Sequence, residues 1–541
     1  MKLKFKLLTP VIALGAVCSF LISSCSNADV DPYEDTNYSE MTATVTFWEN
    51  LYDEDGAAGP EHTMMNNIIK EFNKVYPNIT IKLEDKGRYW DIDEAISGVL
   101  STPDKLPSMA VCYPDYVVGY LDSGNVLNMD PYMSNSTYGL GVKPKSGSTT
   151  EVETDSTTAK DDLNSAFLKE GQEYIEEGTY SLPWYKNSEA LFYNVDALDE
   201  YLGKGNYDLT NWEDIIDAGR KLLAMDNIVT DISAWDDTAN DYVVKPHTVT
   251  WEKGKVTPIG YDSTDNLYIT FSEMMNVPYG GNKDENGDGQ INKSEAVKFY
   301  TEGSGANEKA VQMVKMLKSW YDEGLITTSS IIDPKGKEGV WNYYTYNQEC
   351  FIYVNGSKNA WYGSANYFRG EVLPTPVIDD GMLEATPTVK NKTAKSKAMS
   401  QGANIVFFNK SKVENIAAWL FYKFMTNSMN SASTAVTMSS MPVRATSYGE
   451  DAITAITEAD VSLPETPNQN DNYNYLQKEV YDIYEQYDTN EQTFIAPVSQ
   501  FSDATRSAVK SLLENVFKSE EEGAALDKYI EDQFKAAWEA I

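Results

Sequence analysis

Residues 178–194 read GTYSLPWYKNSEALFYN, two short β-prone runs separated by a polar and aromatic stretch. Pro183 has no backbone N–H to give to a sheet ladder, so the first run must end there or lie at a sheet edge. The second run, 190–193, is apolar and continues into a short helix-like segment at 196–201. This stretch predicts two strands in different domains, joined by a polar crossing.

The length of the chain also favours two domains, because 541 residues exceed what a single hydrophobic core usually holds. Residues 43–48 and 79–83 alternate like strands, and the segment between them carries apolar residues at helical spacing. A β–α–β start of this kind predicts a parallel sheet. At the other end, two amphipathic helices are expected near 504–517 and 526–541.

The first residues predict export. Three lysines among the first six residues precede an apolar run that ends in ISSC at Cys25. A charged start before a short apolar run indicates a secretory signal rather than a spanning helix. Small residues directly before a cysteine resemble a bacterial lipobox. We therefore expect a lipoprotein signal peptide at 1–24, a lipid on Cys25 that holds the protein at the cell membrane, and a polar tether over 25–42. A plain signal peptide cleaved elsewhere is the alternative.

Charge and composition limit the partners. The net charge is −38, and removal of 1–24 leaves 41 basic against 82 acidic residues, or −41. Such a chain is not expected to bind nucleic acid, which requires clustered Lys and Arg. The 36 tyrosines and 11 tryptophans either fill the cores or line a cleft that stacks on sugar rings. Cys112 and Cys350 are expected to be buried and unpaired, with a disulfide as the alternative.

Candidate ligand contacts follow from strand ends. In open α/β sheets, ligands bind beyond the carboxyl ends of the strands. This rule selects Glu49 and Asn50 after the first strand, and Tyr113 and Asp115 after a buried apolar run at 107–112. Asp115 could instead cap the helix that follows it.

Several segments resemble one family of binding proteins. Four sets of residues are similar to family 1 extracellular solute-binding proteins of ABC transporters, the maltose-binding-protein-like group. They are residues 178–194, FW and YPNI at 47–48 and 76–79, the expected strand with LPTP at 373–376, and the expected turn MPVR at 441–444. The resemblance implies an α/β, two-lobed periplasmic-binding-protein-like fold (type II), with two sheets, flanking helices and a multi-segment hinge. The implied boundaries are 43–188 plus 402–436 for lobe 1, and 189–401 plus 437–541 for lobe 2.

The resemblance also implies a function. A monomeric, non-enzymatic receptor would capture a carbohydrate, an oligosaccharide, between its lobes and deliver it to the permease subunits of an ABC transporter. Core packing is an equal reading of Trp361, and Trp212 is expected to pack in lobe 2. The expected ligand contacts are Trp48, Glu49, Asn50, Tyr113, Asp115, Trp184, Glu189, Trp361 and Arg444.

Residues 284–295, DENGDGQINKSE, match the twelve-residue EF-hand calcium loop. Gly289 permits the sharp turn, and the loop supplies only oxygen donors, as calcium prefers. An acidic turn without metal is the alternative. The sequence shows no second loop of this kind, so a paired calcium sensor is not expected. A structural calcium ion is therefore expected. Its ligands would be Asp284, Asn286, Asp288, Gln290 through its carbonyl, Asn292 through water, and Glu295.

Two other functions remain open from the sequence. A secreted glycoside hydrolase needs only two carboxylates, which this acidic chain could supply. A catalytic triad that depends on histidine is disfavoured, because His62 and His247 are the only histidines. A helical-repeat, outer-membrane glycan-capture lipoprotein would fit the lipobox and the many aromatics. The strand–helix alternation near the amino terminus disfavours it.

Overall fold

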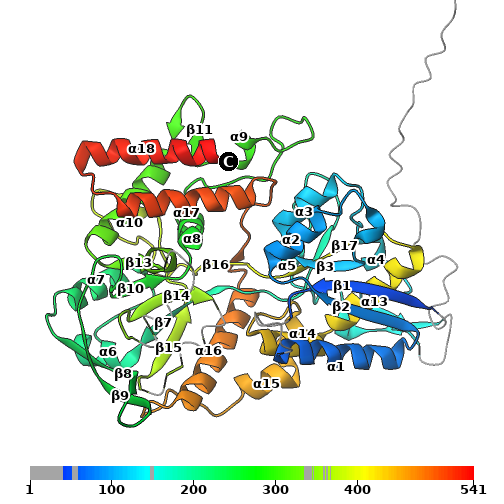
Figure 1. The fold of residues 1–541 in the computed structure, drawn as a ribbon, viewed down its shortest axis with the longest axis horizontal. Helices are drawn as coiled ribbons and strands as arrows, with labels where there is room; N and C mark the ends of the chain where they lie inside the picture. The colour runs from blue at the N-terminus through cyan, green and yellow to red at the C-terminus, as the bar shows by residue number, and fades with distance from the viewer. Residues whose placement is uncertain are drawn as a thin grey trace, which may run out of the picture.

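The computed structural model describes residues 41–51, 59–145, 151–333, 344, 347–356, 360, 364–365 and 367–541. Two five-stranded sheets lie at the centres of two lobes, with helices on their faces (Figure 1). This arrangement confirms the predicted two-lobed α/β fold and excludes a helical-repeat protein. In the part of the chain that the structure describes, no helix is both long and apolar enough to cross a bilayer.

The first sheet has the order β2-β1-β3-β17-β6. Its strands β1 and β2 pair in parallel, as the β–α–β start predicts, whereas β17 runs antiparallel to β3 and β6. The short strand β6 lies at the sheet edge and ends at Pro183, because proline cannot extend the ladder. The strand bounds are Ala43–Glu49 for β1, Ile79–Asp85 for β2, Met109–Cys112 for β3, Ser181–Pro183 for β6 and Asn404–Phe407 for β17.

Helices of lobe 1 cover this sheet. In α1, Met65, Ile68 and Phe72 point into the core, which explains their helical spacing in the sequence. Phe72 contacts Phe421 of α13 edge to face, with ring centroids 5.2 Å apart. The helices are α1 (Pro60–Val75), α2 (Tyr89–Ser97), α3 (Pro114–Leu121), α4 (Asp130–Met133), α5 (Ser165–Glu170), α13 (Lys412–Met425) and α14 (Ser428–Met438).

The second sheet has the order β13-β10-β14-β7-β15. All six residues of β7 are buried, since its two faces contact different hydrophobic clusters. Leu191 and Tyr193 face one cluster, and Ala190 and Phe192 face the other. The strand bounds are Glu189–Asn194 for β7, Ile259–Tyr261 for β10, Ile326–Thr328 for β13, Ile352–Gly356 for β14 and Gly370–Pro374 for β15.

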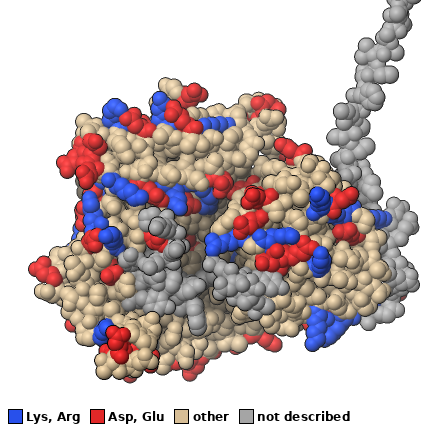
Figure 2. Space-filling model, in the orientation of Figure 1, with Lys and Arg blue, Asp and Glu red and all other residues tan. Residues whose placement is uncertain are grey.

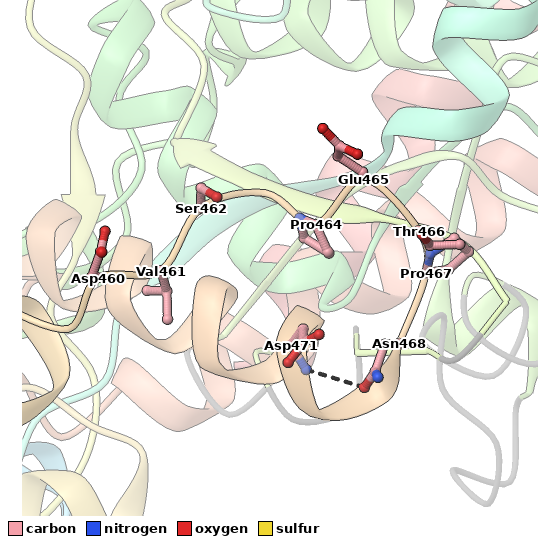
Figure 3. A pocket seen from close by; sticks show the side chains of 9 residues that line it. All are labelled: Asp460, Val461, Ser462, Pro464, Glu465, Thr466, Pro467, Asn468 and Asp471. Carbon is pink, nitrogen blue, oxygen red and sulfur yellow. Dashed lines mark hydrogen bonds between the residues drawn. The ribbon is translucent and has the colours of Figure 1, made fainter.

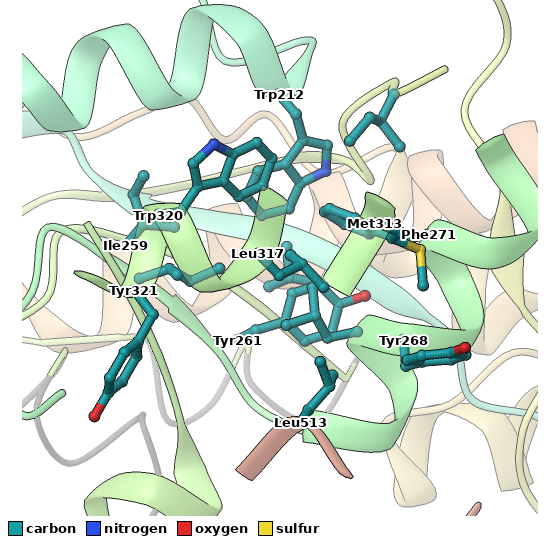
Figure 4. Close-up of a cluster of buried hydrophobic side chains, with 14 of the residues drawn as sticks. Trp212, Ile259, Tyr261, Tyr268, Phe271, Met313, Leu317, Trp320, Tyr321 and Leu513 are labelled. Atoms are coloured by element: carbon teal, nitrogen blue, oxygen red, sulfur yellow. The ribbon is translucent and has the colours of Figure 1, made fainter. Parts of the chain in front are cut away.

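The core of lobe 2 contains a stack of aromatic rings (Figure 4). Trp212 at the start of α7 lies parallel to Trp320 of α10 with centroids 5.9 Å apart, and Phe271 of α8 meets Trp212 edge on. The prediction that Trp212 packs in lobe 2 is confirmed. The helices are α6 (Val195–Leu198), α7 (Trp212–Leu223), α8 (Thr264–Met275), α9 (Lys293–Ala296), α10 (Glu308–Asp322), α11 (Ser329–Ile332), α15 (Asp451–Thr457), α16 (Gln469–Thr489), α17 (Ser502–Lys518) and α18 (Gly523–Ala540).

Short strand pairs complete the fold. One of them, β8–β9, is a hairpin of two nine-residue strands on which Trp235 and Tyr242 are exposed. The sequence patterns did not predict this hairpin. The remaining strands are β4 (Val142–Pro144), β5 (Val152–Thr154), β8 (Ile228–Asp236), β9 (Asp241–Val249), β11 (Tyr300–Thr301), β12 (Gly305–Ala306), β16 (Ala398–Met399) and β18 (Thr493–Phe494).

Three passes of the chain join the lobes. The segment between β6 and β7 pairs with two others, because Asn187 forms a bridge with Gln401 and Lys186 forms one with Met441. Gly402, in the second pass, has φ of +108°, and a Cβ there would lie 2.9 Å from the Tyr185 carbonyl oxygen. Only glycine fits this conformation and this approach.

A buried ammonium lies in the hinge. The Lys186 side chain is fully buried, pairs with the carboxylate of Glu170 and donates to Asn404 Oδ1 at 2.6 Å. Glu170 belongs to α5 and Asn404 to β17, so one cation connects three distant segments. Removal of one partner from a buried pair leaves a charge without compensation.

We therefore expect Lys186→Met to lower the free energy of unfolding by about 3–5 kcal/mol. The double variant Lys186→Met with Glu170→Gln should recover part of that loss, because it removes both charges. Denaturant unfolding measures both effects. Lys528→Met removes an exposed lysine paired with Asp532 and should change stability by at most about 1 kcal/mol. Equal losses for Lys186→Met and Lys528→Met would contradict the assignment.

The two cysteines lie in different lobes. Cys112 ends β3 and Cys350 lies two residues before the start of β14, and both are free and buried. The expectation of unpaired, buried thiols is confirmed, and the alternative of a disulfide between them is excluded.

Candidate functional site

A cavity of about 260 Å³ lies between the lobes. Lobe 1 contributes the start of α3 and Glu170, the hinge contributes Asn187 and residues 400–402, and lobe 2 contributes residues 495–498 and the first turns of α17. The volume is slightly below the roughly 300–1,000 Å³ usual for small-molecule sites. Ligands bind beyond strand ends in sheets of this kind, and the start of α3 directly follows β3.

Tyr113 and Asp115, two of the predicted contacts, line this cavity. The helix α3 begins at Pro114, so Asp115 is in its first turn and Tyr113, rather than Asp115, is the N-cap residue. Burial raises the pKa of the Asp115 carboxyl group, and the Arg506 guanidinium opposes that rise. Tyr113 supplies an aromatic face next to a hydrogen-bond acceptor, a combination suited to a sugar ring.

Buried polar groups without partners also face this region. Ser400 and Glu170 both line the cavity, and both are more than nine-tenths buried. Among the described residues, neither Ser400 Oγ nor Glu170 Oε1 has a hydrogen-bond partner. Such groups are costly to bury unless something satisfies them, so they mark positions where ligand atoms can bind.

Arg506 of α17 forms the lobe 2 wall of the cavity. Its guanidinium donates to Asp265 Oδ2 at 2.9 Å and to Asn266 Oδ1 at 3.1 Å. Gln401 Nε2 of the hinge donates to the same Asn266 oxygen at 2.9 Å. The hinge and the wall of lobe 2 are thereby fixed relative to each other.

Glu49 and Asn50 lie beside the cavity in an adjoining polar cluster. The Tyr89 and Tyr185 hydroxyl oxygens are 2.7 Å apart, and the Asn50 side chain interacts with both. The Tyr89 ring packs on Tyr113, with centroids 4.4 Å apart, and so connects the cluster to the cavity. Glu49 accepts the Leu51 N–H, and burial raises its pKa to about 7.

Other predicted contacts do not line the cavity. The Trp48 indole donates to Glu84 at 3.0 Å, and Trp184 packs against Phe47 in the core of lobe 1. Arg444 is buried and donates to the carbonyl oxygens of Thr426 and Ala159. Their role in ligand binding stays a prediction. Trp361 and Cys25 lie outside the described residues.

Glu189 lies inside lobe 2, close behind the cavity. Its carboxylate accepts hydrogen bonds from Tyr261 at 3.0 Å and Thr270 at 2.8 Å. Asn266, which also contacts Arg506, is a further partner. Burial outweighs these hydrogen bonds and raises the pKa of Glu189 to about 7. The side chain thus supports the cavity wall, and its own access to a ligand stays a prediction.

The calcium loop has a defined backbone. Asp284 accepts N–H groups of Gly287, Asp288 and Gly289, and Glu295 accepts those of Glu285, Asn286 and Asn292. Those N–H bonds hold the pKa of Asp284 below its usual value. Within the described residues, no three His, Cys, Asp or Glu side chains are grouped to hold a metal. Asp284 and Glu295 would therefore have to exchange N–H partners for an ion.

A second pocket, of about 450 Å³, is formed by residues 460–471 alone (Figure 3). Its side chains come from one loop and the first turn of α16, and Asp460, Glu465 and Asp471 do not point toward one another. One segment of chain supplies all of its groups, so it lacks the convergence of the cavity between the lobes.

Sequence reasoning missed the lobe 2 half of the site. Arg506 and Asp503 fall in a helix that reads as an amphipathic closing element, and Ser400 precedes a Gln-Gly pair that reads as a turn. An arginine on the first turns of a helix after Ala-Pro-Val was the available signal, but spacing alone does not reveal which lobe wall it reaches.

The raised pKa of Glu189 predicts a pH effect on stability. Its value of about 7 in the folded protein lies above the ordinary 4.5, so its contribution is complete below pH 4.5 and is lost as pH rises to 7. A rise of this size in the pKa corresponds to about 3 kcal/mol. We expect the unfolding free energy of Glu189→Gln to decline by about 3 kcal/mol less than that of the wild type between pH 4.5 and 7.5.

Denaturant titrations at several pH values measure this decline. Glu520→Gln alters an exposed glutamate and serves as the control, for which the wild-type pH profile should persist. A Glu189→Gln profile as steep as that of the wild type would exclude the assignment.

Comparison with solved structures shows the same fold in several binding proteins. The sugar-binding protein MalE from Xanthomonas citri has a TM-score of 0.58 at 12% identity, over 92% of this chain and 97% of that one. Lmo0181 from Listeria monocytogenes, an ABC substrate-binding protein in complex with cycloalternan, has 0.57 at 13%, over 92% and 98%. UgpB from Mycobacterium tuberculosis, in complex with glycerophosphocholine, has 0.57 at 14%, over 92% and 98%.

The sequence itself identifies the family. No curated protein sequence gives a significant match. The family described as bacterial extracellular solute-binding protein matches residues 67–462, well over half of the chain. Its members bind solutes and are not hydrolases, so the glycoside hydrolase alternative is set aside. The chain belongs to the family of bacterial extracellular solute-binding proteins.

Proposed function

We propose that this protein is the substrate receptor of an ABC transporter and that it captures a carbohydrate, an oligosaccharide, between its lobes. The observation that carries the proposal is the cavity that both lobes and the hinge line together. A ligand that contacts both walls stabilises the closed form, and a permease can recognise that form. The receptor is expected to act as a monomer.

The chemistry of the cavity supports a sugar. Tyr113 and Tyr116 offer ring faces, Asp115 and Asp503 accept hydrogen bonds, and Ser400 can donate or accept. Rings beside acceptors match the alternating faces and hydroxyl edges of a pyranose. Among the structural relatives above, MalE is described as a sugar-binding protein and Lmo0181 is in complex with cycloalternan, whereas UgpB is in complex with glycerophosphocholine. The fold alone therefore does not choose the ligand.

We further propose that the mature protein begins at Cys25, carries a lipid there and stands off the cell membrane on the tether 25–42. The charged, apolar and ISSC succession at the amino terminus supports this. A receptor held at the membrane stays near its permease, which raises the effective concentration of the pair.

Thermal denaturation against neutral oligosaccharides tests the carbohydrate assignment. A binder should raise the midpoint by mass action, and isothermal titration should give the dissociation constant. Tyr113→Ala removes a ring from the cavity and should weaken binding by about tenfold or more, since an aromatic face contributes about 1 kcal/mol beyond its area.

Trp235→Ala is the matched control, because Trp235 is an exposed aromatic on the β8–β9 hairpin, outside the cavity lining. Its affinity should equal that of the wild type. If no neutral oligosaccharide shifts the midpoint, or Tyr113→Ala binds as tightly as the wild type, the assignment is wrong.

We also propose that residues 284–295 bind a structural calcium ion. Support comes from the all-oxygen donor set at EF-hand spacing, from Gly289 with φ of +85° at the sixth position, and from the buried Ile291 that anchors the loop to lobe 2. When bound, the ion would replace the N–H partners of Asp284 and Glu295 with a single cation.

Calcium should raise the midpoint of the chelator-treated protein, and Glu295→Gln should abolish that rise because it removes one bidentate carboxylate oxygen pair. Asp236→Asn is the control, since Asp236 is likewise a carboxylate that accepts two backbone N–H groups, at the tip of the β8–β9 hairpin. A midpoint that does not respond to calcium or chelator would refute the site.

A further inference from the structure

The positively charged groups in and near the cavity are already paired with acidic side chains. Arg506 is the only Lys or Arg among the described residues that line it. Its guanidinium is already bonded to Asp265 and Asn266 of the same lobe, at 2.9 Å and 3.1 Å. The remaining buried cation nearby, Lys186, is paired with Glu170. Each of these two cations therefore already has an acidic partner.

Acidic side chains outnumber basic ones among the described residues that line the cavity. Asp115 lines the cavity from lobe 1 and Asp503 lines it from lobe 2, one helical turn before Arg506. Burial raises the pKa of Asp93 of α2, and repulsion from Asp503 adds to that rise. Of the three acidic side chains Asp115, Asp265 and Asp503, only Asp265 forms an ion pair with Arg506 in the part of the chain that the structure describes. Two of them, Asp115 and Asp503, come from opposite walls and line the space that a ligand would occupy.

We propose that this cavity selects against anionic ligands and takes an uncharged or amino-bearing carbohydrate, with Arg506 acting as an internal counter-ion rather than as an anion receptor. This inference rests on the proposed function. An anionic sugar would place a third negative charge between Asp115 and Asp503, where like charges in a partly dehydrated site repel strongly. Neutral hydroxyl or protonated amino groups would instead donate to these carboxylates and to Glu170 Oε1.

The net charge of the chain does not by itself carry this inference, because a local basic pocket can exist in an acidic protein. On the face shown in Figure 2, Lys and Arg side chains are interspersed with Asp and Glu over both lobes. The selectivity is therefore assigned to Asp115, Asp503 and the engaged Arg506, not to the average surface.

Matched probes test the proposal. Maltotriose, cellotriose and mannotriose are compared with the uronic acid oligomers made by oxidising their primary hydroxyl groups, by isothermal titration at low ionic strength. Wild-type protein should bind at least one neutral trisaccharide, and at least tenfold more tightly than its uronic counterpart. In the double variant Asp115→Asn with Asp503→Asn, that ratio should fall to about threefold or less.

Asp532→Asn is the control, because it removes one charge from an exposed residue of α18 paired with Lys528, and it should keep the wild-type ratio. A uronic oligomer that binds the wild type as tightly as its neutral counterpart overturns the proposal while leaving carbohydrate binding intact. An unchanged ratio in the double variant overturns it as well.

If no neutral trisaccharide binds the wild type, the carbohydrate assignment fails for these sugars. The proposed selection against anions is then tested with the double variant alone. If the double variant binds a uronic oligomer that the wild type does not bind, selection against anions is supported. If it binds none, that proposal is overturned.

Discussion

The buried ammonium of Lys186 constrains how the two lobes are joined. A charge removed from water must keep its partners, and here those partners come from α5 and β17 while the backbone of Lys186 pairs with Met441. Four segments, two of them more than 200 residues from Lys186, therefore have to meet at one point. The short strand β6, the entry to β7 and the return pass at Gly402 take their positions from that meeting.

The cavity between the lobes borders this same hinge region. Asn187 and Gly402 belong to the hinge and line the cavity, and Glu170 gives one carboxylate oxygen to Lys186 while the other has no partner among the described residues. A ligand that donates to this second oxygen would interact with the ion pair that holds the hinge. Ligand binding there and lobe movement would then share one carboxylate, and this would couple occupancy of the cavity to closure.

Sequence patterns predicted the parts of the fold that local rules control. Pro183 marked the end of an edge strand, the spacing in α1 gave its buried face, and the tryptophan at the start of α7 was placed correctly in lobe 2. The site was predicted only where it follows a strand directly, at Tyr113 and Asp115. Arg506 was missed because its contacts, Asp265 and Asn266, are about 240 residues away, and no local period encodes that pairing.

The two thiols have a practical consequence. Cys112 and Cys350 are almost completely buried, and burial raises the pKa of each well above the ordinary value, so both remain protonated and shielded from reagents. Since the thiolate is the reactive form, the native cysteines of the folded lobes should resist maleimides. A cysteine introduced at the rim of the cavity could then carry a fluorophore at a single position, and the native scaffold would serve as a reagentless optical sensor of its own solute.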